Sequence, residues 1–199
     1  MTPDRLRQLL ERIDQLNRED PNTELVEEIP QPRELLYAQR LSEWVKRLDP
    51  NPSEALQIAA RAQHIQRWTI PRDRYERNRQ GYLRWRETLK AFHIDTTARL
   101  MREAGYAEEM IAQVSRLMSK RHLKEDVDTQ TLEDALCLVF LETQLAELRE
   151  KTPDEKMRDI LRKTWQKVSE RGRTVALQLP WSDEDRAWLQ QAISPDKSV

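Results

Sequence analysis

The sequence predicts an all-α protein, folded as a single-domain bundle of about eight helices. Glycine occurs only 3 times in 199 residues, which is too rarely for the turns of a β-sandwich or for a glycine-rich nucleotide loop. Leu, Ala, Glu, Arg, Gln and Lys dominate the stretches between breaking residues, and all of them favour helices. Apolar residues make up 38% of the chain and charged residues 35%, a balance that suits a domain with a buried core.

Apolar residues recur at helical spacing through the first half of the chain. They predict helices over about residues 3–16, 33–48 and 53–68, with Ser53 as the N-cap of the third. A long fourth helix is expected to begin near Gly81 and to end at Gly105, because glycine commonly follows the last helical turn.

The second half of the chain predicts four more helices. They cover about residues 108–119, 131–148 and 153–170, followed by a short last helix that begins near Ser182. The 131–148 helix is apolar nearly all round, so we expect it at the centre of the core. The predicted helical domain spans residues 1–180, and residues 181–199 form a short helix and a frayed tail.

The sequence lacks the signals of a membrane or secreted protein. No apolar run approaches the ~20 residues that a membrane span requires, and the N-terminus has no apolar signal-peptide core. The single cysteine, Cys137, lies in the apolar run ALCLVFLE, where we expect it to be a packing residue. We therefore predict a soluble, cytoplasmic protein with no membrane partner.

Positive charge is concentrated in the middle of the chain. The net charge is −1, yet residues 61–90 contain eight Arg and one Lys against three Asp or Glu. Such a segment favours an anionic ligand, because Arg binds phosphate or carboxylate with two hydrogen bonds and nearby aromatic rings can stack a base. Alternatively, these arginines form a solvated face and pair with acidic residues. The predicted substrate-binding residues are Arg67, Arg72, Arg79, Arg86 and Lys120.

Two histidines and an aspartate fall on predicted core helices. The aspartate, Asp134, shares an apolar stripe with Cys137 and Leu138, where a carboxylate needs a compensating partner. Imidazole nitrogens and a carboxylate oxygen suit one divalent transition metal ion, and three protein ligands leave positions open for water and substrate. We predict that His64, His93 and Asp134 hold such an ion, with Glu133 or His122 as general base or acid. In the alternative interpretation the histidines bond to backbone or carboxylate groups, and Asp134 pairs with an arginine.

Between Leu36 and Leu177 the chain resembles the helical family called domain of unknown function 4202. The resemblance rests on five stretches: LYAQRLSEWV, ARAQHIQRWTIPRDRY, GYLRWRETLKAFH, LKEDVDTQTLEDALCLVFLE and ILRKTWQKVSERG. The resemblance covers most of the chain. It implies membership of this family, but it does not imply a particular activity.

A second, more distant resemblance is to the HD-domain metal-dependent phosphohydrolases. His64, His93 and Asp134 match, in order, the first histidine, the histidine of the His-Asp doublet and the last aspartate of that family. Ile94 stands where the doublet has its aspartate, and Asp95 points about 100° away on a helix. The resemblance therefore implies an HD-like helical fold with at most one metal ion.

These observations lead to two hypotheses of function. The first is a metal-dependent hydrolase that acts on a small phosphorylated or nucleotide-like anion. The second is a non-catalytic helical module that binds RNA, a nucleotide or an acidic partner through the arginine-rich segment. The sequence leaves the substrate, the metal and the oligomeric state open.

Overall fold

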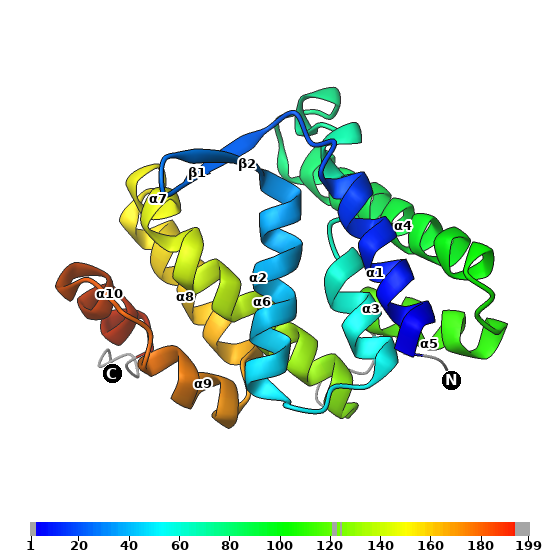
Figure 1. Ribbon diagram of the computed structural model, residues 1–199. Helices are drawn as coiled ribbons and strands as arrows, with labels where there is room; N and C mark the ends of the chain where they lie inside the picture. Colours follow the sequence, from blue (N-terminus) through cyan, green and yellow to red (C-terminus); the bar gives the residue numbers. More distant parts are fainter. Residues whose placement is uncertain (1–2, 121–122, 124, 194–199) are drawn as a thin grey trace. The chain divides into compact units, whose positions relative to one another are not determined.

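The computed structural model describes residues 3–120, 123 and 125–193, and it confirms that the chain is mostly helical. These residues form ten α-helices, two short 3₁₀-helices and one β-hairpin (Figure 1). The chain divides into two compact units, Met1–Leu132 and Glu133–Val199. The division falls within α6 (Val127–Thr143). The domain boundary expected near residue 180 stays a prediction.

The first unit contains most of the predicted helices at nearly the predicted positions. Its elements are α1 (Pro3–Asn17), β1 (Thr23–Val26), β2 (Ile29–Pro32), α2 (Arg33–Leu48), α3 (Glu54–Ala62), η1 (Arg67–Thr69), η2 (Arg72–Arg74), α4 (Arg79–Glu103) and α5 (Glu108–Ser119). The third helix is the exception, since it ends at Ala62 and not near Trp68. The backbone of Gln66 is left-handed (φ 50°), which a continuing α-helix cannot accommodate.

Helix α3 forms the core of the first unit. It contacts α1, α2 and α5. All of its apolar side chains are buried, and four of its nine residues are alanine. Small side chains allow neighbouring helices to approach closely, so that α3 is surrounded on several sides. The turn that follows α3 is bonded to α1, through the Gln66 N–H and the Asn17 side chain, and to α4, through the Ile65 carbonyl and His93.

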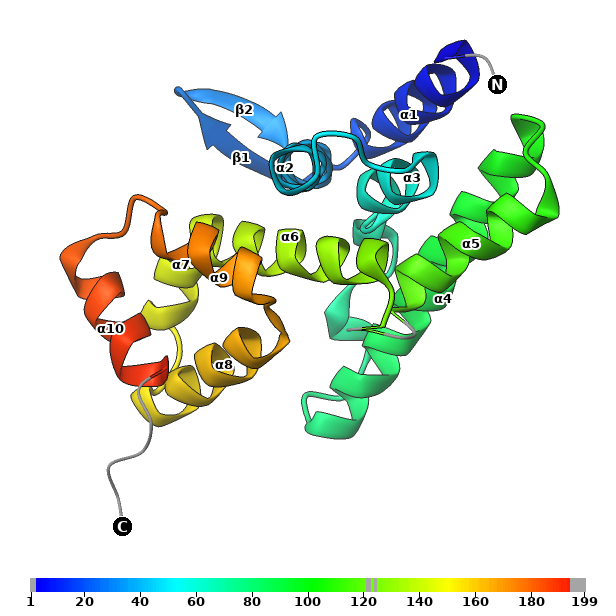
Figure 2. The same ribbon diagram turned by 90° about the horizontal axis from the view of Figure 1, so that it is seen from below.

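The hairpin is an element that the sequence prediction missed. β1 and β2 are antiparallel, with Val26 opposite Ile29, so that Glu27 and Glu28 form a two-residue turn (Figure 2). Both glutamates have a positive φ, which suits a type I′ turn but is uncommon for this residue type. The usual Asn-Gly signal is absent, and two prolines in β2 argue against a strand.

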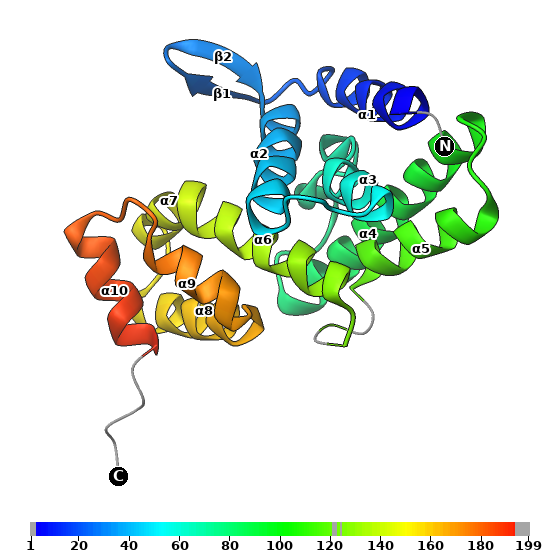
Figure 3. The ribbon, with the colours of Figure 1, turned by 60° about the horizontal axis from the view of Figure 1, so that its bottom comes forward.

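The second unit contains the rest of α6 together with α7 (Leu145–Glu150), α8 (Asp154–Lys167), α9 (Glu170–Leu177) and α10 (Asp183–Ile193). Within this unit α10 lies beside α8 (Figure 3). The helix predicted over 131–148 is two helices, because Gln144 leaves the helical conformation (φ −123°, ψ −16°). The prediction also missed α9, which begins after Ser169.

Two smaller expectations concern Cys137 and the membrane. The Cys137 thiol is free and buried in α6, as expected of a packing residue. In the part of the chain that the structure describes, no helix combines the length and the apolar character needed to cross a bilayer. The cytoplasmic location stays a prediction.

Substitution of Ser53 by alanine should destabilise the first unit. The Ser53 hydroxyl accepts a hydrogen bond from the Leu56 N–H (3.0 Å) and donates one to the Asp128 carboxylate (2.5 Å). We expect Ser53→Ala to lower the free energy of unfolding by ~1–2 kcal/mol in urea titrations. Ser42→Ala is the control, because the Ser42 hydroxyl only bonds back to the Ala38 carbonyl in mid-helix. Equal losses in both variants would contradict the capping role of Ser53.

Candidate functional site

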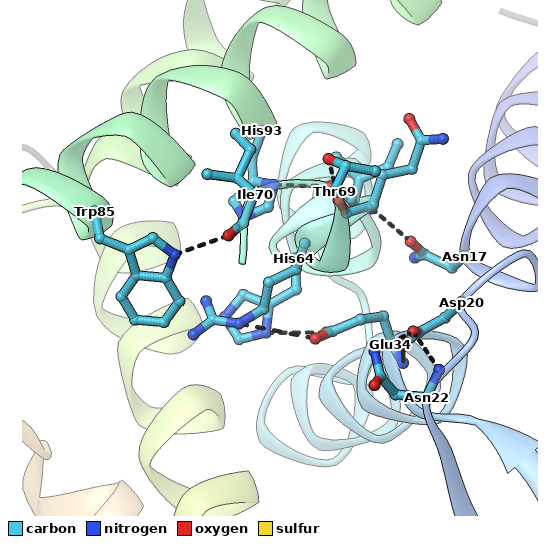
Figure 4. Close-up of polar contacts among 12 residues, drawn as sticks. Asn17, Asp20, Asn22, Glu34, His64, Thr69, Ile70, Trp85 and His93 are labelled. Carbon is cyan, nitrogen blue, oxygen red and sulfur yellow. Dashed lines mark hydrogen bonds and ion pairs between the residues drawn. The ribbon is translucent and has the colours of Figure 1, made fainter. Parts of the chain in front are cut away.

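Four polar side chains meet in the first unit and form what we call the histidine–arginine cluster: Glu34, His64, Arg67 and His93. Figure 4 shows three of them, Glu34, His64 and His93. Glu34 lies in the first turn of α2, and His93 lies in the middle of α4. His64 follows α3, and Arg67 opens η1 three residues later. The short segment after α3 therefore supplies both an imidazole and a guanidinium group.

His93 is buried, with 4% of its surface exposed. Its Nδ1 lies 2.8 Å from the carbonyl oxygen of Ile65. Because a carbonyl only accepts, Nδ1 must carry the proton, and the Nε2 of the neutral ring keeps its lone pair. That Nε2 is buried and has no hydrogen-bond partner among the described residues. Burial, and then the neighbouring His64, lower the pKa of His93 to about 3, so the ring is neutral at pH 7.

His64 is partly exposed and lies between an aromatic ring and a carboxyl group. Its imidazole stacks on Tyr37, with ring centroids 4.0 Å apart, and lies 6.0 Å from the ring of His93. Its Nδ1 is 3.3 Å from a carboxylate oxygen of Glu34. Burial lowers the pKa of His64 well below its usual value, and the positive charges of nearby side chains lower it further. The cluster therefore contains two neutral imidazoles at pH 7.

Glu34 is the titrating member of the cluster. Burial raises the pKa of Glu34 to about 7, against the opposing charge of Arg67, whose Nε lies 3.8 Å from the carboxyl group. The carboxylate of Asp20 accepts the Glu34 backbone N–H (3.0 Å), and its negative charge also raises the pKa of Glu34. At neutral pH this carboxyl group is therefore present in both forms and can accept or donate a proton.

Three of the five predicted anion-binding residues act on this cluster. Arg67 lies within it, and its guanidinium group sits 4.7 Å above the ring of Trp85. Arg86 and Lys120 both lower the pKa of His64 through their positive charge. Positive side chains thus dominate the electrostatic environment of His64. The carboxyl group of Glu34 lies beside His64, and its pKa of about 7 means that part of it is neutral at pH 7.

The other two predicted residues have different surroundings. The Arg72 guanidinium group donates to the carbonyl oxygens of Tyr75 (2.9 Å) and Glu76 (2.7 Å), so it closes its own loop. Arg79 is exposed at the start of α4 and forms no ion pair with any described residue. Among the described residues, Arg67 and Arg86 therefore act on the cluster, whereas Arg72 lies 6.0 Å from the ring of Trp85, the ring that also supports Arg67. A substrate contact by Arg72 or Arg79 stays a prediction.

The remaining predicted site residues are Asp134, Glu133 and His122. Asp134, in the second unit, accepts hydrogen bonds from the backbone N–H (2.8 Å) and the hydroxyl of Ser169, which precedes α9. Glu133 is buried in the same unit, with Lys167 Nζ at 3.6 Å. His122 lies outside the described residues. Among those that are described, no three or more His, Cys, Asp or Glu side chains are placed to share a metal ion. The shared site of His64, His93 and Asp134 stays a prediction.

Sequence reasoning overlooked Glu34, although a signal for it exists. Glu34 shares a helical stripe with the buried residues Ala38, Leu41 and Val45 of α2. A carboxyl group on an apolar stripe needs a compensating partner, and the same argument had singled out Asp134. Tyr37 was also missed, because nothing in the sequence shows that it stacks on His64.

The fold and the cluster together define a helical protein with a cationic site built on two neutral histidines. Residues 7–188 match the family described as a domain of unknown function (DUF4202), and the chain belongs to that family. No curated protein and no solved structure matches the chain. These findings give no support to a relationship with the HD-domain phosphohydrolases.

The elevated pKa of Glu34 can be measured directly. We expect its side-chain carboxyl carbon to titrate near pH 7 in ¹³C NMR spectra, well above the ~4.3 of a glutamate in a model peptide. Arg67→Gln should move the Glu34 midpoint to higher pH, because the charge that favours the carboxylate is removed. A Glu34 midpoint below 5 would show that the group is well solvated.

The burial of His93 changes the expected effect of its removal. Helix propensity alone would lead to the expectation that His93→Ala leaves the fold intact. The imidazole, however, fills core space and bonds to the Ile65 carbonyl. We now expect a loss of ~2–4 kcal/mol in the free energy of unfolding. Thr88→Ala on the exposed face of α4 should change it by less than ~0.5 kcal/mol. A His93→Ala variant as stable as wild type would restore the original expectation.

Proposed function

We propose that this protein is a hydrolase that acts on a small phosphorylated or nucleotide-like anion in the histidine–arginine cluster. One observation carries the proposal. A carboxyl group with a pKa of about 7 faces a neutral imidazole, and the positive charges of Arg67, Lys120 and Arg86 act on the same imidazole. This combination provides a proton acceptor and an anion-binding field in one place.

The electrostatics support an anionic substrate. Arg67, Lys120 and Arg86 act together on His64, and Glu34 is the one carboxyl group in the cluster. A phosphate group would replace the missing negative charge and would accept hydrogen bonds from the guanidinium groups. The Trp85 ring beneath Arg67 keeps one face of that guanidinium away from water, which strengthens its attraction for an anion.

Glu34 is the proposed general base. In the carboxylate form it removes a proton from a water molecule, whose oxygen forms a bond to phosphorus as the bond to the leaving oxygen breaks. Because its pKa is near 7, the resulting carboxylic acid can then give that proton to the leaving oxygen. The products are inorganic phosphate and an alcohol, and no other reactant is consumed.

A divalent transition metal ion belongs to the same proposal. The orphan Nε2 of His93 fits a metal ligand, because its Nδ1–H is held by a backbone carbonyl, as is usual for ligating histidines. Two imidazoles on one tetrahedral ion have ring centroids roughly 5–6 Å apart, which matches His64 and His93 at 6.0 Å. When bound, the ion would lower the pKa of its water.

In its most specific form, the proposal also includes a relationship to the HD-domain phosphohydrolases. The order of His64, His93 and Asp134 supports it, and Ile94 in place of the doublet aspartate counts against it. The second candidate function is binding without catalysis. It is favoured by the finding that the described residues offer no ready group of three metal ligands.

Hydrolysis assays on p-nitrophenyl phosphate and a panel of nucleoside phosphates, each with and without added Mn²⁺ or Zn²⁺, test the proposal. Below pH 7 Glu34 is protonated and cannot act as a base, so we expect the rate to rise with pH through about 7. Glu34→Gln should lower kcat by a factor of about 10²–10⁴ and remove this pH dependence.

Glu43→Gln is the matched control, because Glu43 lies on the same helix, is exposed and pairs with Arg47. It should retain the wild-type rate and pH profile. Phosphate binding without turnover under every condition would establish the second candidate and refute the hydrolase.

A further inference from the structure

The surface formed by residues 74–86 carries arginines that have no ion-pair partner among the described residues. Arg74, Arg77, Arg79 and Arg84 are exposed, and none of them forms an ion pair or a side-chain hydrogen bond with a described residue. Some exposed arginines elsewhere in the chain do pair with acidic residues: Arg47 with Glu43, Arg99 with Glu103 and Arg102 with Glu108. Residues 74–86 contain five arginines and a single acidic residue, Glu76, so the positive charge of this surface is not neutralised locally and suits an external anion.

An exposed aromatic ring lies within this surface. Arg79, Tyr82 and Arg86 occupy positions i, i+3 and i+7 of α4, so they follow one face of the helix. Tyr82 is 42% exposed, and the guanidinium group of Arg86 lies 5.8 Å from the centroid of its ring. The adjacent Leu83 is 52% exposed. We call Arg79, Tyr82 and Arg86 the α4 stripe.

The α4 stripe leads to the histidine–arginine cluster. Burial lowers the pKa of both His64 and Arg67, and the charge of Arg86 lowers both further. Tyr82 is 6.0 Å from Trp85, whose ring supports Arg67. One end of the stripe therefore borders the cluster, and the other end lies at Arg79, two turns away along the helix.

The length and chemistry of this surface fit a chain of phosphates. Seven residues of α-helix span roughly 10 Å, which is longer than a single phosphate monoester and suits consecutive phosphodiesters. An exposed tyrosine flanked by arginines is a stacking platform for an unpaired base, and a duplex would keep its bases out of reach. An acidic peptide would match the charge but would not use the ring.

We propose that the α4 stripe, with Arg74, Arg77 and Arg84, binds single-stranded nucleic acid. The terminal phosphate of the bound strand then enters the histidine–arginine cluster. This inference deepens the proposed function, since it names a phosphorylated polynucleotide end as the substrate class. The strand binding itself rests on the unpaired arginines and the exposed ring, which do not depend on catalysis.

Fluorescence anisotropy with 5′-phosphorylated oligouridylate and oligothymidylate, labelled at the 3′ end, tests the binding over a series of NaCl concentrations. Arg79→Gln/Arg84→Gln should weaken binding on the order of tenfold and should lower the salt slope by about 0.7 for each phosphate that the variant no longer neutralises. Arg99→Gln/Arg102→Gln is the matched control, because it removes two paired arginines from the same helix and should bind as wild type does.

Tyr82 separates stacking from charge. Tyr82→Ala should weaken binding on the order of tenfold, and Tyr82→Phe should restore it, because phenylalanine keeps the ring. A preference for oligouridylate would identify RNA as the ligand. Equal affinity for both oligonucleotides would show that the surface recognises the phosphates and unpaired bases that RNA and DNA share. Either result supports the proposal.

Three results would overturn the proposal. They are no binding by the wild type, equal binding of a duplex of the same length, and an equal loss of affinity in the Arg99→Gln/Arg102→Gln control. Failure of the proposed hydrolase is a separate outcome, since release of phosphate is measured on the same oligonucleotides. Specific binding without phosphate release would refute catalysis and leave the strand-binding surface in place.

Discussion

The backbone of Gln66 occupies the left-handed region (φ 50°), and its N–H donates to the side-chain carbonyl of Asn17, a residue buried completely at the end of α1 (3.0 Å). A non-glycine residue in this conformation costs about 1–2 kcal/mol, which the surrounding contacts must offset. This turn ends α3 and directs the Ile65 carbonyl at His93. It also places His64 and Arg67 on one short segment. The geometry of the candidate site therefore depends on a contact between α1 and the turn after α3.

Burial determines the proton chemistry of the cluster. The same exclusion of water raises the pKa of the Glu34 carboxyl group and lowers those of both imidazoles, because it disfavours every charged form. The result is an inversion of the usual roles at pH 7. The histidines are fixed as neutral acceptors, and the glutamate becomes the group that exchanges protons. Arg67 stays charged in this setting because the Glu34 carboxyl group lies beside it and the Trp85 ring lies under it.

The sequence predicted the helical class and most helix positions, because apolar periodicity and breaking residues are local signals. It missed the hairpin, whose turn uses two glutamates, and the end of α3, which is set by Asn17 from far away in the chain. The same division holds for the site. His64, His93 and Arg67 were found by residue type and charge density, whereas the role of Glu34 depends on burial that only the folded chain shows. Asp134, singled out by its position on an apolar stripe, is bonded to Ser169 in the second unit.

Two contacts fix the backbone conformation of the loop between η1 and α4. Arg72 donates to two of its carbonyl groups, and a side chain at position 81 would lie 2.2 Å from the Glu76 carbonyl oxygen, so only glycine permits this close approach. Arg74 and Arg77 therefore project from a backbone that became ordered when the chain folded. A ligand that contacts them has to immobilise side chains alone, and the entropy cost of ordering a flexible basic loop does not reduce its affinity.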